Sequence, residues 1–435
     1  MEINQQMLQE KWAPVLDSAD AGKLTGHKRA VTAVVLENQE KAFAQEKAQL
    51  TEVAANTTSA NTNIDNWDPV LINLVRRATP ALLAFDLVGV QPMTGPTGLI
   101  FAMKSKYTTQ AGTEALFNEA DTGFSGTASG DLGTADAGNN DPFSGDDPTS
   151  GPNADAADSD TVAEYQPGSA MTTPTAEALG NTGNAFAEMA FSIDKTTVTA
   201  KSRALKAQYT IELAQDLKAV HGLSAETELA NILSTEILAE MNREIIRLVN
   251  INGVTSTQGA VAGIWNKSSA VDADGRWAVE KFKSLVHAIE IEANQIAVST
   301  RRGKGNWVIV SHGVAAALNA AGALDTGLGI TGGDNVDSDV TGSLFAGTLL
   351  GRTKVYIDPY AGVDYFTVGY KGTNPYDAGM FYCPYVPLSM MKTIGENDFQ
   401  PKIGFKTRYG IADNPFVTAG NNNNVYYRKR KVTNL

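Results

Sequence analysis

Apolar residues recur three or four positions apart over one long stretch of the chain, from Ser224 to Gly253. This spacing places them on one face of an α-helix. Ser224 is a suitable N-cap and Gly253 a suitable stop. Because no Pro or Gly interrupts the stretch, the pattern predicts a helix about 40 Å long. Its buried face is expected to hold Leu229, Ile232, Leu233, Ile237, Met241, Ile245 and Leu248.

The other periodic stretches predict a mixture of helices and strands, so the fold class is α+β. A second amphipathic helix is expected over 278–298, and a buried strand, 307–310, leads into a short helix. Alternating residues predict one strand leaving at 99–103 and a strand region returning over 189–209. Further strands are expected at 355–358, 365–370, 379–385 and 404–410. The basic stretch from Tyr427 to Val432 is expected to be a tail that is mobile at its end.

Residues 1–52 form a charged, helix-prone segment whose apolar pattern is weak, with no evident core of its own. At residue 53 the composition changes abruptly to small, uncharged, polar residues, which is typical of a linker or an extended arm. The boundary between these segments is therefore a candidate processing site, since such joints are where nicking is easiest.

Charge is distributed unevenly along the chain. The stretch 107–194 holds 15 Asp or Glu and no Lys or Arg, so it carries −15 of a net charge of −13, and the remainder is close to neutral at +2. The remainder is thus not a basic nucleic-acid binder. We expect the acidic stretch to face away from any polyanion that the protein contacts, because like charges repel.

Catalytic and metal-binding patterns are missing from the sequence. The four histidines (His27, His221, His287 and His312) are isolated, and no Gly-x-Ser-x-Gly or His-Glu-x-x-His motif occurs. Acidic turns at 272–275 and 334–339 lack the Gly and Glu positions of an EF-hand. The single cysteine, Cys383, is expected to be a small buried hydrophobe. We therefore expect no enzymatic activity, no cofactor and no metal. The sequence also shows neither a membrane-spanning stretch nor a secretory signal.

Four blocks of sequence resemble the major capsid proteins of T-even-type tailed bacteriophages, which are built on the Hong Kong 97 shell fold. The first block reads Gly89-Val-Gln-Pro-Met-Thr-Gly-Pro-Thr-Gly, and the others cover 200–222, 365–372 and 404–411. Weaker similarity extends from Leu8 to about Phe416. The chain departs from the family at 107–190, which is shorter and more acidic than the family's inserted outer domain, and after Phe416.

The resemblance implies a role for each segment of the chain. Residues 1–52 would be a scaffolding-like propeptide, 53–88 an N-terminal arm, and 89–200 an extended loop with an acidic insertion. Residues 201–253 would form the peripheral domain around its spine helix, and 254–390 the axial domain. Residues 391–435 would return to the peripheral domain and end in the tail.

The implied function is a structural one. The chain would self-assemble into hexamers of an icosahedral or prolate head that encloses double-stranded DNA in the virion, after assembly in the bacterial cytoplasm. The implied partners are further copies of the chain, the vertex capsid protein, a maturation protease, scaffold and portal proteins, decorating proteins and weakly contacted DNA, with no membrane. Two alternatives stay open: the pentameric vertex protein of the same family, and a calcium- or carbohydrate-binding surface protein. An encapsulating bacterial shell is disfavoured by the propeptide-like segment.

The resemblance also predicts a cleavage site, because the family is cut after Leu/Ile-x-Glu. Leu50, Thr51 and Glu52 fit this motif, with Val53 as the new N-terminus. The motif also occurs at 8–10 and 238–240. The second of these lies inside the predicted long helix, where cleavage would require local unfolding.

Overall fold

The fold is described from a computed structural model, which covers residues 2–17, 24, 26–52, 82–116, 120, 124–125, 171–181, 185–273, 275–325, 345–394, 400–416 and 420–435. These residues form a mixture of helices and sheets, as the sequence predicts. The chain divides into two units: residues 1–100 with 196–435, and residues 101–195. Most of the acidic stretch, including residues 131–160, and the turn at 334–339 lie outside the described residues.

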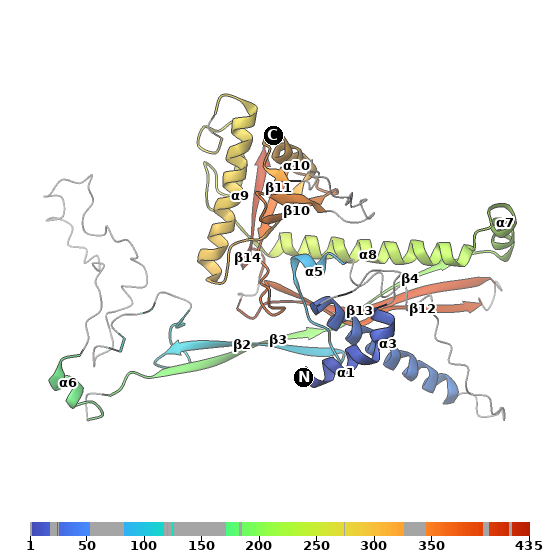
Figure 1. The fold of residues 1–435 in the computed structure, drawn as a ribbon, viewed down its shortest axis with the longest axis horizontal. Helices are drawn as coiled ribbons and strands as arrows, with labels where there is room; N and C mark the ends of the chain where they lie inside the picture. Colours follow the sequence, from blue (N-terminus) through green and yellow to red (C-terminus); the bar gives the residue numbers. More distant parts are fainter. Residues whose placement is uncertain are drawn as a thin grey trace. The chain divides into compact units, whose positions relative to one another are not determined.

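A four-stranded sheet forms one part of the first unit (Figure 1). Its strands lie in the order β1 (Gly89–Val90), β12 (Met380–Ile394), β13 (Pro401–Asp413) and β4 (Lys201–Gln208). β1 is parallel to β12, whereas β12, β13 and β4 pair in antiparallel fashion. The register of β12 against β13 shifts between Pro384 and Ser389. Proline cannot donate to a strand ladder, which accounts for an interruption at Pro384.

An eight-stranded sheet forms the other part of the first unit. Its order is β5-β14-β11-β7-β10-β9-β8, with β6 also paired to β14. The strand bounds are β5 (Gly253–Thr255), β6 (Ile264–Asn266), β7 (Trp307–Ser311), β8 (Leu324–Asp325), β9 (Phe345–Leu349), β10 (Thr353–Asp358), β11 (Tyr365–Gly369) and β14 (Asn424–Thr433). The strands expected near 307, 355 and 365 are therefore confirmed.

Both faces of the strand β7 are covered, which explains its uninterrupted apolar sequence. Val308 and Val310 belong to a core formed with α9 (Ala278–Thr300) and α10 (His312–Ala320). The alternate residues Trp307 and Ile309 belong to a second core that includes α8 (Ala225–Asn252). The helix expected over 278–298 is thus confirmed as α9, and it packs on the eight-stranded sheet (Figure 1).

The C-terminal residues correct our prediction. We expected a basic tail that is mobile at its end, but 424–433 form β14, which lies inside the eight-stranded sheet between β5 and β11. Its arginines pair with buried carboxylates: Arg428 lies 3.3 Å from Glu292 of α9, and Arg430 lies 3.6 Å from Asp272. β14 lies in the same sheet as the strands of 254–390, whereas residues 380–390 belong to β12 of the four-stranded sheet.

The returning region 189–209 contains two strands rather than one. β3 (Met189–Thr199) pairs with β2 (Thr97–Tyr107) in a separate two-stranded sheet, as the outgoing and returning pattern predicts. After Ala200, β4 joins the four-stranded sheet. A short helix, α6 (Thr173–Glu177), belongs to the second unit.

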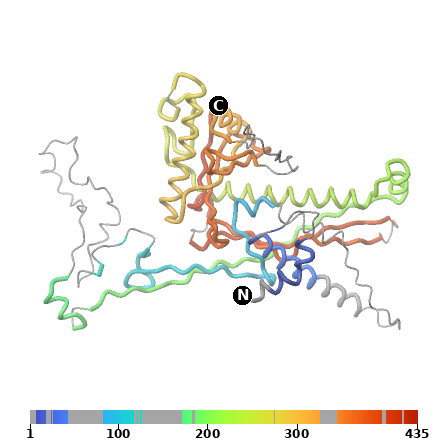
Figure 2. Tube along the Cα trace, viewed as in Figure 1, coloured from blue at the N-terminus to red at the C-terminus, as the bar shows by residue number. Residues whose placement is uncertain are grey.

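The N-terminal residues form α1 (Glu2–Lys11), α2 (Ala13–Leu16) and α3 (Gly26–Glu52). In Figure 2 this blue segment lies beside the red strands of the four-stranded sheet, and α3 packs on β12. Two short helices, α5 (Ala84–Leu87) and α7 (Ile211–His221), complete the first unit.

Candidate assembly site

The predicted long helix is α8, with 28 residues from Ala225 to Asn252. Its length is therefore about 42 Å at 1.5 Å per residue. Four of the predicted face residues are buried: Leu233, Ile237, Met241 and Ile245. Leu229 and Leu248 are half-buried, and Ile232 is 61% exposed. The helix ends at Gly253 as expected, although this glycine is extended (φ −60°) and not left-handed.

Ion pairs fix α8 to both sheets of the first unit. Arg243 Nη1 lies 2.6 Å from Asp358 Oδ1 at the end of β10, and Tyr365 Oη donates to the other oxygen of Asp358 at 2.6 Å. Burial alone would raise the pKa of Asp358, but the hydrogen bonds from Arg243 and Tyr365 outweigh burial and lower it. On the four-stranded sheet, Arg203 of β4 lies 2.7 Å from Glu244. These links make α8 the element that joins the two sheets.

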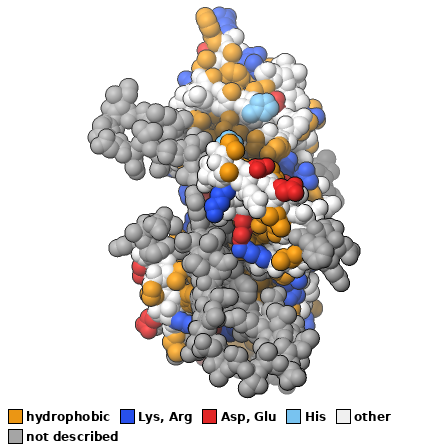
Figure 3. Space-filling view, turned by 90° about the vertical axis from the view of Figure 1, so that its right-hand side faces the viewer, with side chains coloured by type: hydrophobic (Ala, Val, Ile, Leu, Met, Phe, Trp, Pro, Cys, Tyr) orange, Lys and Arg blue, Asp and Glu red, His pale blue; other side chains and the backbone are white. Residues whose placement is uncertain are grey.

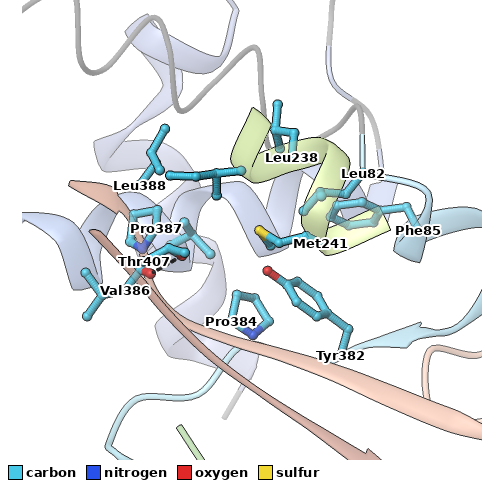
Figure 4. A pocket seen from close by; sticks show the side chains of 12 residues that line it. Leu82, Phe85, Leu238, Met241, Tyr382, Pro384, Val386, Pro387, Leu388 and Thr407 are labelled. Carbon is cyan, nitrogen blue, oxygen red and sulfur yellow. Dashed lines mark hydrogen bonds between the residues drawn. The ribbon is translucent and has the colours of Figure 1, made fainter. Parts of the chain in front are cut away.

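A small cavity lies beneath α8, where the helix meets β12 (Figure 4). Its volume is about 40 Å³, which is close to that of one or two water molecules. It is lined by Met241 of α8, Tyr382 and Leu388 of β12, Phe85 of α5 and Val35 of α3, among others. The lining is mainly apolar and the volume is small. The cavity is a packing defect at a junction of four elements and does not have the size of a ligand site.

The β2–β3 ribbon carries an apolar face that nothing covers among the described residues. Ala200 N donates to Pro96 O, and Thr108 N donates to Glu188 O, both at 2.9 Å. These two hydrogen bonds define the same antiparallel register of β2 against β3. In this register the odd-numbered residues of both strands share one face. That face holds six large apolar side chains, each between 54% and 67% exposed: Leu99, Phe101, Met103, Met189, Phe191 and Ile193. A patch of this kind marks an interaction surface.

The N-terminal segment shares the core of the first unit, although we predicted a segment with no evident core of its own. The residues from Val31 to Leu36 are buried at six consecutive positions of α3. Six consecutive residues cover every side of a helix, so α3 is enclosed. Trp12 and Leu16 of the N-terminal segment belong to the same core as residues 82–90 and the buried face of α8. Burying six large apolar side chains (Trp12, Leu16, Val31, Val34, Val35 and Leu36) contributes on the order of 10 kcal/mol before chain entropy is counted.

Polar side chains of α3 also contact the rest of the first unit. Asn38 Nδ2 donates to the backbone oxygens of Met93, at 2.7 Å, and Tyr385, at 3.0 Å. His27 Nε2 lies 2.9 Å from Val90 O, and burial lowers the pKa of this imidazole. Lys371 donates to Phe85 O nearby, and burial lowers the pKa of its ammonium group to about 8. Sequence reasoning missed these contacts because their acceptors are backbone groups of distant residues.

The residues of the proposed cleavage motif lie at the end of α3. The helix reaches Glu52, and Val53 lies outside the described residues, as do the side chains of Leu50 and Thr51. The competing motif at 238–240 lies in the middle of α8. Its backbone is therefore hydrogen-bonded within a packed helix, which protects it from a protease that binds extended chains.

The remaining candidates for chemistry do not form a metal site in the part of the chain that the structure describes. Among the described residues, no three His, Cys, Asp or Glu side chains group as a metal site, and no helix could cross a membrane. Asp272 pairs with Arg430, so its carboxylate already has a structural role. Cys383 is 2% exposed, and burial raises the pKa of its thiol to about 12, so it is the buried hydrophobe that we expected. On the face shown in Figure 3, acidic and basic side chains are interspersed with hydrophobic ones over the described residues.

Comparison with known proteins decides the family. A family model described as major capsid protein Gp23 matches residues 64–432. The chain belongs to the Gp23 major capsid protein family. It is therefore a structural protein of the phage head, located in the virion, as the resemblance implied. The relatives are described as capsid proteins and not as enzymes, which agrees with the absence of a catalytic motif.

Curated members of the Gp23 family match over nearly the whole chain. The major capsid protein of Salmonella phage ViI is 40% identical over 94% of this chain and 90% of its own length. That of Enterobacteria phage T4 is 38% identical over 94% of this chain and 92% of its own. The T4 capsid vertex protein is 28% identical over 54% of this chain and 55% of its own. Solved structures that match include the capsid of Myoviridae phage XM1, at 9% identity and a TM-score of 0.41 over 80% of this chain and 92% of that one.

Proposed function

We propose that this Gp23-family protein assembles as hexamers into an icosahedral or prolate head of the Hong Kong 97 type, which encloses double-stranded DNA. The vertex capsid protein would occupy the pentamer positions, and portal, scaffold and decorating proteins would complete the particle. The near-neutral charge outside 107–194 supports weak contact with the packaged DNA.

The apolar face of the β2–β3 ribbon is the observation that carries this proposal. An isolated pair of strands is marginally stable in water and needs a further surface to cover its apolar side. Six large side chains on one face, all more than half exposed, leave that requirement unmet within the described part of the chain. A neighbouring copy of the same chain is the occupant we propose, since a shell supplies such a neighbour at every position.

The role of the β2–β3 ribbon in assembly can be tested by substitutions that leave the core unchanged. We expect the double variant Phe101→Ser, Phe191→Ser to fold as the wild-type chain does, because both side chains are exposed (66% and 57%). It should fail to form shells, because the covering contact loses most of its apolar area. Sedimentation and electron microscopy of the expressed protein measure this. A conservative variant on the other face, Ser192→Ala, serves as the control, and wild-type shell yield from the double variant would contradict the proposal.

We further propose that each segment keeps the role implied by the resemblance, with the boundaries changed by the strand pairing. Residues 53–88 would act as the arm and 89–200 as the extended loop. The peripheral domain would combine 201–253 with β12 and β13, and the axial domain would combine the eight-stranded sheet with α9 and α10. Supporting this division, β12 and β13 pair with β4 in one sheet, whereas β14 pairs with β5 and β11 in the other.

Finally, we propose that a maturation protease removes residues 1–52 by cutting after Glu52, with a second cut after Glu10. The motif at 50–52 and the change of composition at residue 53 support this.

The vertex-protein alternative is less well supported, because the similarity to the T4 vertex protein covers only about half of each chain. The number of copies per virion would distinguish the two roles. The calcium-binding alternative loses one of its two candidate turns, since Asp272 is engaged by Arg430.

A further inference from the structure

We propose that the surface beneath α3 is a helix-binding site in its own right, whose ligand is residues 26–42, and that cutting the chain after Glu52 does not release the N-terminal segment. The severed segment would remain bound without a covalent link. Its departure would then need a further step that disrupts α3 or moves β12 away from Met93. This inference rests on the proposed cleavage and adds a regulated release to it.

The apolar part of the site explains why the segment should stay bound. α3 is enclosed at six consecutive positions, from Val31 to Leu36. Part of this enclosure comes from α1 of the same segment, and the rest comes from β12. Leu82, Phe85 and Leu388 lie in the same core and line the small cavity together with Val35. Loss of α3 would expose this part of β12 and the small cavity that Val35 helps to line. The cut after Glu52 alters none of these contacts, because the described side chains that make them all precede residue 43.

A polar contact makes the site specific for its ligand. One amide, Asn38 Nδ2, donates to two backbone oxygens that belong to different segments, Met93 O and Tyr385 O. Asn38 is 6% exposed, so these bonds are made away from water. If α3 leaves, both acceptors lose this donor, which penalises release beyond the apolar contribution. The cut is fourteen residues further along the chain than Asn38.

The next residue has the opposite effect. Gln39 is 4% exposed, and neither Nε2 nor Oε1 of its side chain has a hydrogen-bond partner among the described residues. Burying an amide without partners opposes binding. Adjacent positions of α3 thus carry one amide that stabilises the bound helix and one that destabilises it. The destabilising amide lowers the free energy needed to remove the segment.

The experiment uses the full chain with a heterologous protease site placed between Glu52 and Val53 and an affinity tag at the C-terminus. The purified protein is cut completely and captured through the tag. The fraction of the N-terminal fragment that remains with the captured chain is then followed over time. We expect most of the fragment to be retained at micromolar concentration after cutting. Loss of the fragment as fast as the peptide bond is cut would overturn the proposal.

Two neighbouring substitutions give results of opposite sign. Asn38→Leu removes both hydrogen bonds and should speed release about tenfold, as expected for a loss of about 1.4 kcal/mol. Gln39→Leu removes the unpartnered amide and should slow release several-fold. Lys41→Gln, on a side chain that is 67% exposed, should leave the rate unchanged. Equal effects of the Asn38 and Gln39 variants would contradict the assigned contacts.

The outcome of this experiment does not depend on whether the proposed maturation cut occurs. The heterologous site is cut whether or not the phage protease recognises Glu52. Rapid release therefore refutes the helix-binding site alone. An uncut N-terminus in finished particles refutes the natural cleavage alone.

Discussion

Ile232 and Ile237 are the same residue type on the same helix, but their surroundings differ. Ile237 is 2% exposed and lies in the core of the first unit, whereas Ile232 is 61% exposed. Five residues correspond to a rotation of about 140° around a helix, so the two side chains point to different sides.

We therefore predict that Ile237→Asp lowers the free energy of unfolding by several kcal/mol, because it buries an unpaired carboxylate. Soluble subunits and shells should both be lost. Ile232→Asp should change the free energy of unfolding by less than about 1 kcal/mol. Chemical denaturation of the soluble protein and electron microscopy of the particles measure the two effects. Normal shells from Ile237→Asp would show that the buried face of α8 is not required for the subunit to fold.

The spacing of apolar residues predicted the core of α8 correctly but not its edges. Leu233, Ile237, Met241 and Ile245 follow one another at four-residue steps, and all are buried. Ile232 satisfies the same local spacing, yet it faces solvent within the described chain. Spacing alone gives no information on how wide the covered stripe is, because the width depends on the neighbouring elements.

Among the elements, β14 was predicted wrongly because its sequence was interpreted without the distant residues that it contacts. Four consecutive basic residues (Arg428, Lys429, Arg430 and Lys431) suggest a solvated tail. In the structure Arg430 is 3% exposed, and Glu292 of α9 is completely buried near both arginines. The carboxylates that compensate the arginines lie more than 100 residues earlier in the chain, so the sequence pattern of 424–433 contains no sign of them.

We predict that a chain ending at Asn423 does not fold, since it loses a central strand and leaves Glu292 buried without Arg428 or Arg430. Removing one partner of a buried ion pair alone costs about 3–5 kcal/mol. A chain ending at Thr433, which keeps the whole of β14, should express as a soluble protein. The soluble yield of the two truncations, compared with the full chain, measures the contribution of the strand. A folded and assembling chain without β14 would contradict this role.

The helix α3 was misread for a different reason. Over residues 31–36 the helix has no solvent-facing side, so the apolar residues there need not form a stripe. Charged side chains lie beside the buried positions, such as Glu37 of α3, which pairs with Lys11 of α1 at 2.8 Å, and these charges make the apolar pattern of the segment hard to recognise. The sequence therefore predicted the helix itself but not the core that it joins.

For the whole molecule, the resemblance of four sequence blocks was sufficient to identify the family. The contacts between subunits could not be predicted in the same way, because they depend on more than one chain. The outgoing and returning strands were predictable from their alternation, but the apolar face of the ribbon became visible only when the two strands were paired. Nothing in the described part of the chain covers this face. The charge of the chain likewise depends on processing, because removing residues 1–52 takes away six basic and eight acidic side chains and leaves −11.

The last prediction concerns the chain as it exists in the finished particle. If the protease cuts after Glu52, mass spectrometry of protein from infectious virions should find Val53 as the N-terminal residue. Assembled particles that lack the protease should retain the original N-terminus. The variant Glu52→Gln should block the cut while leaving assembly of the first shell intact, because α3 contacts the body through residues that precede position 43. Gln9→Ala lies inside the motif at 8–10, the site of the proposed second cut, but retains its Leu and Glu, so both cuts should occur as in the wild-type chain. An intact residue 1 or 2 in infectious particles would show that the N-terminal segment is a permanent part of the shell, in keeping with its burial in the core.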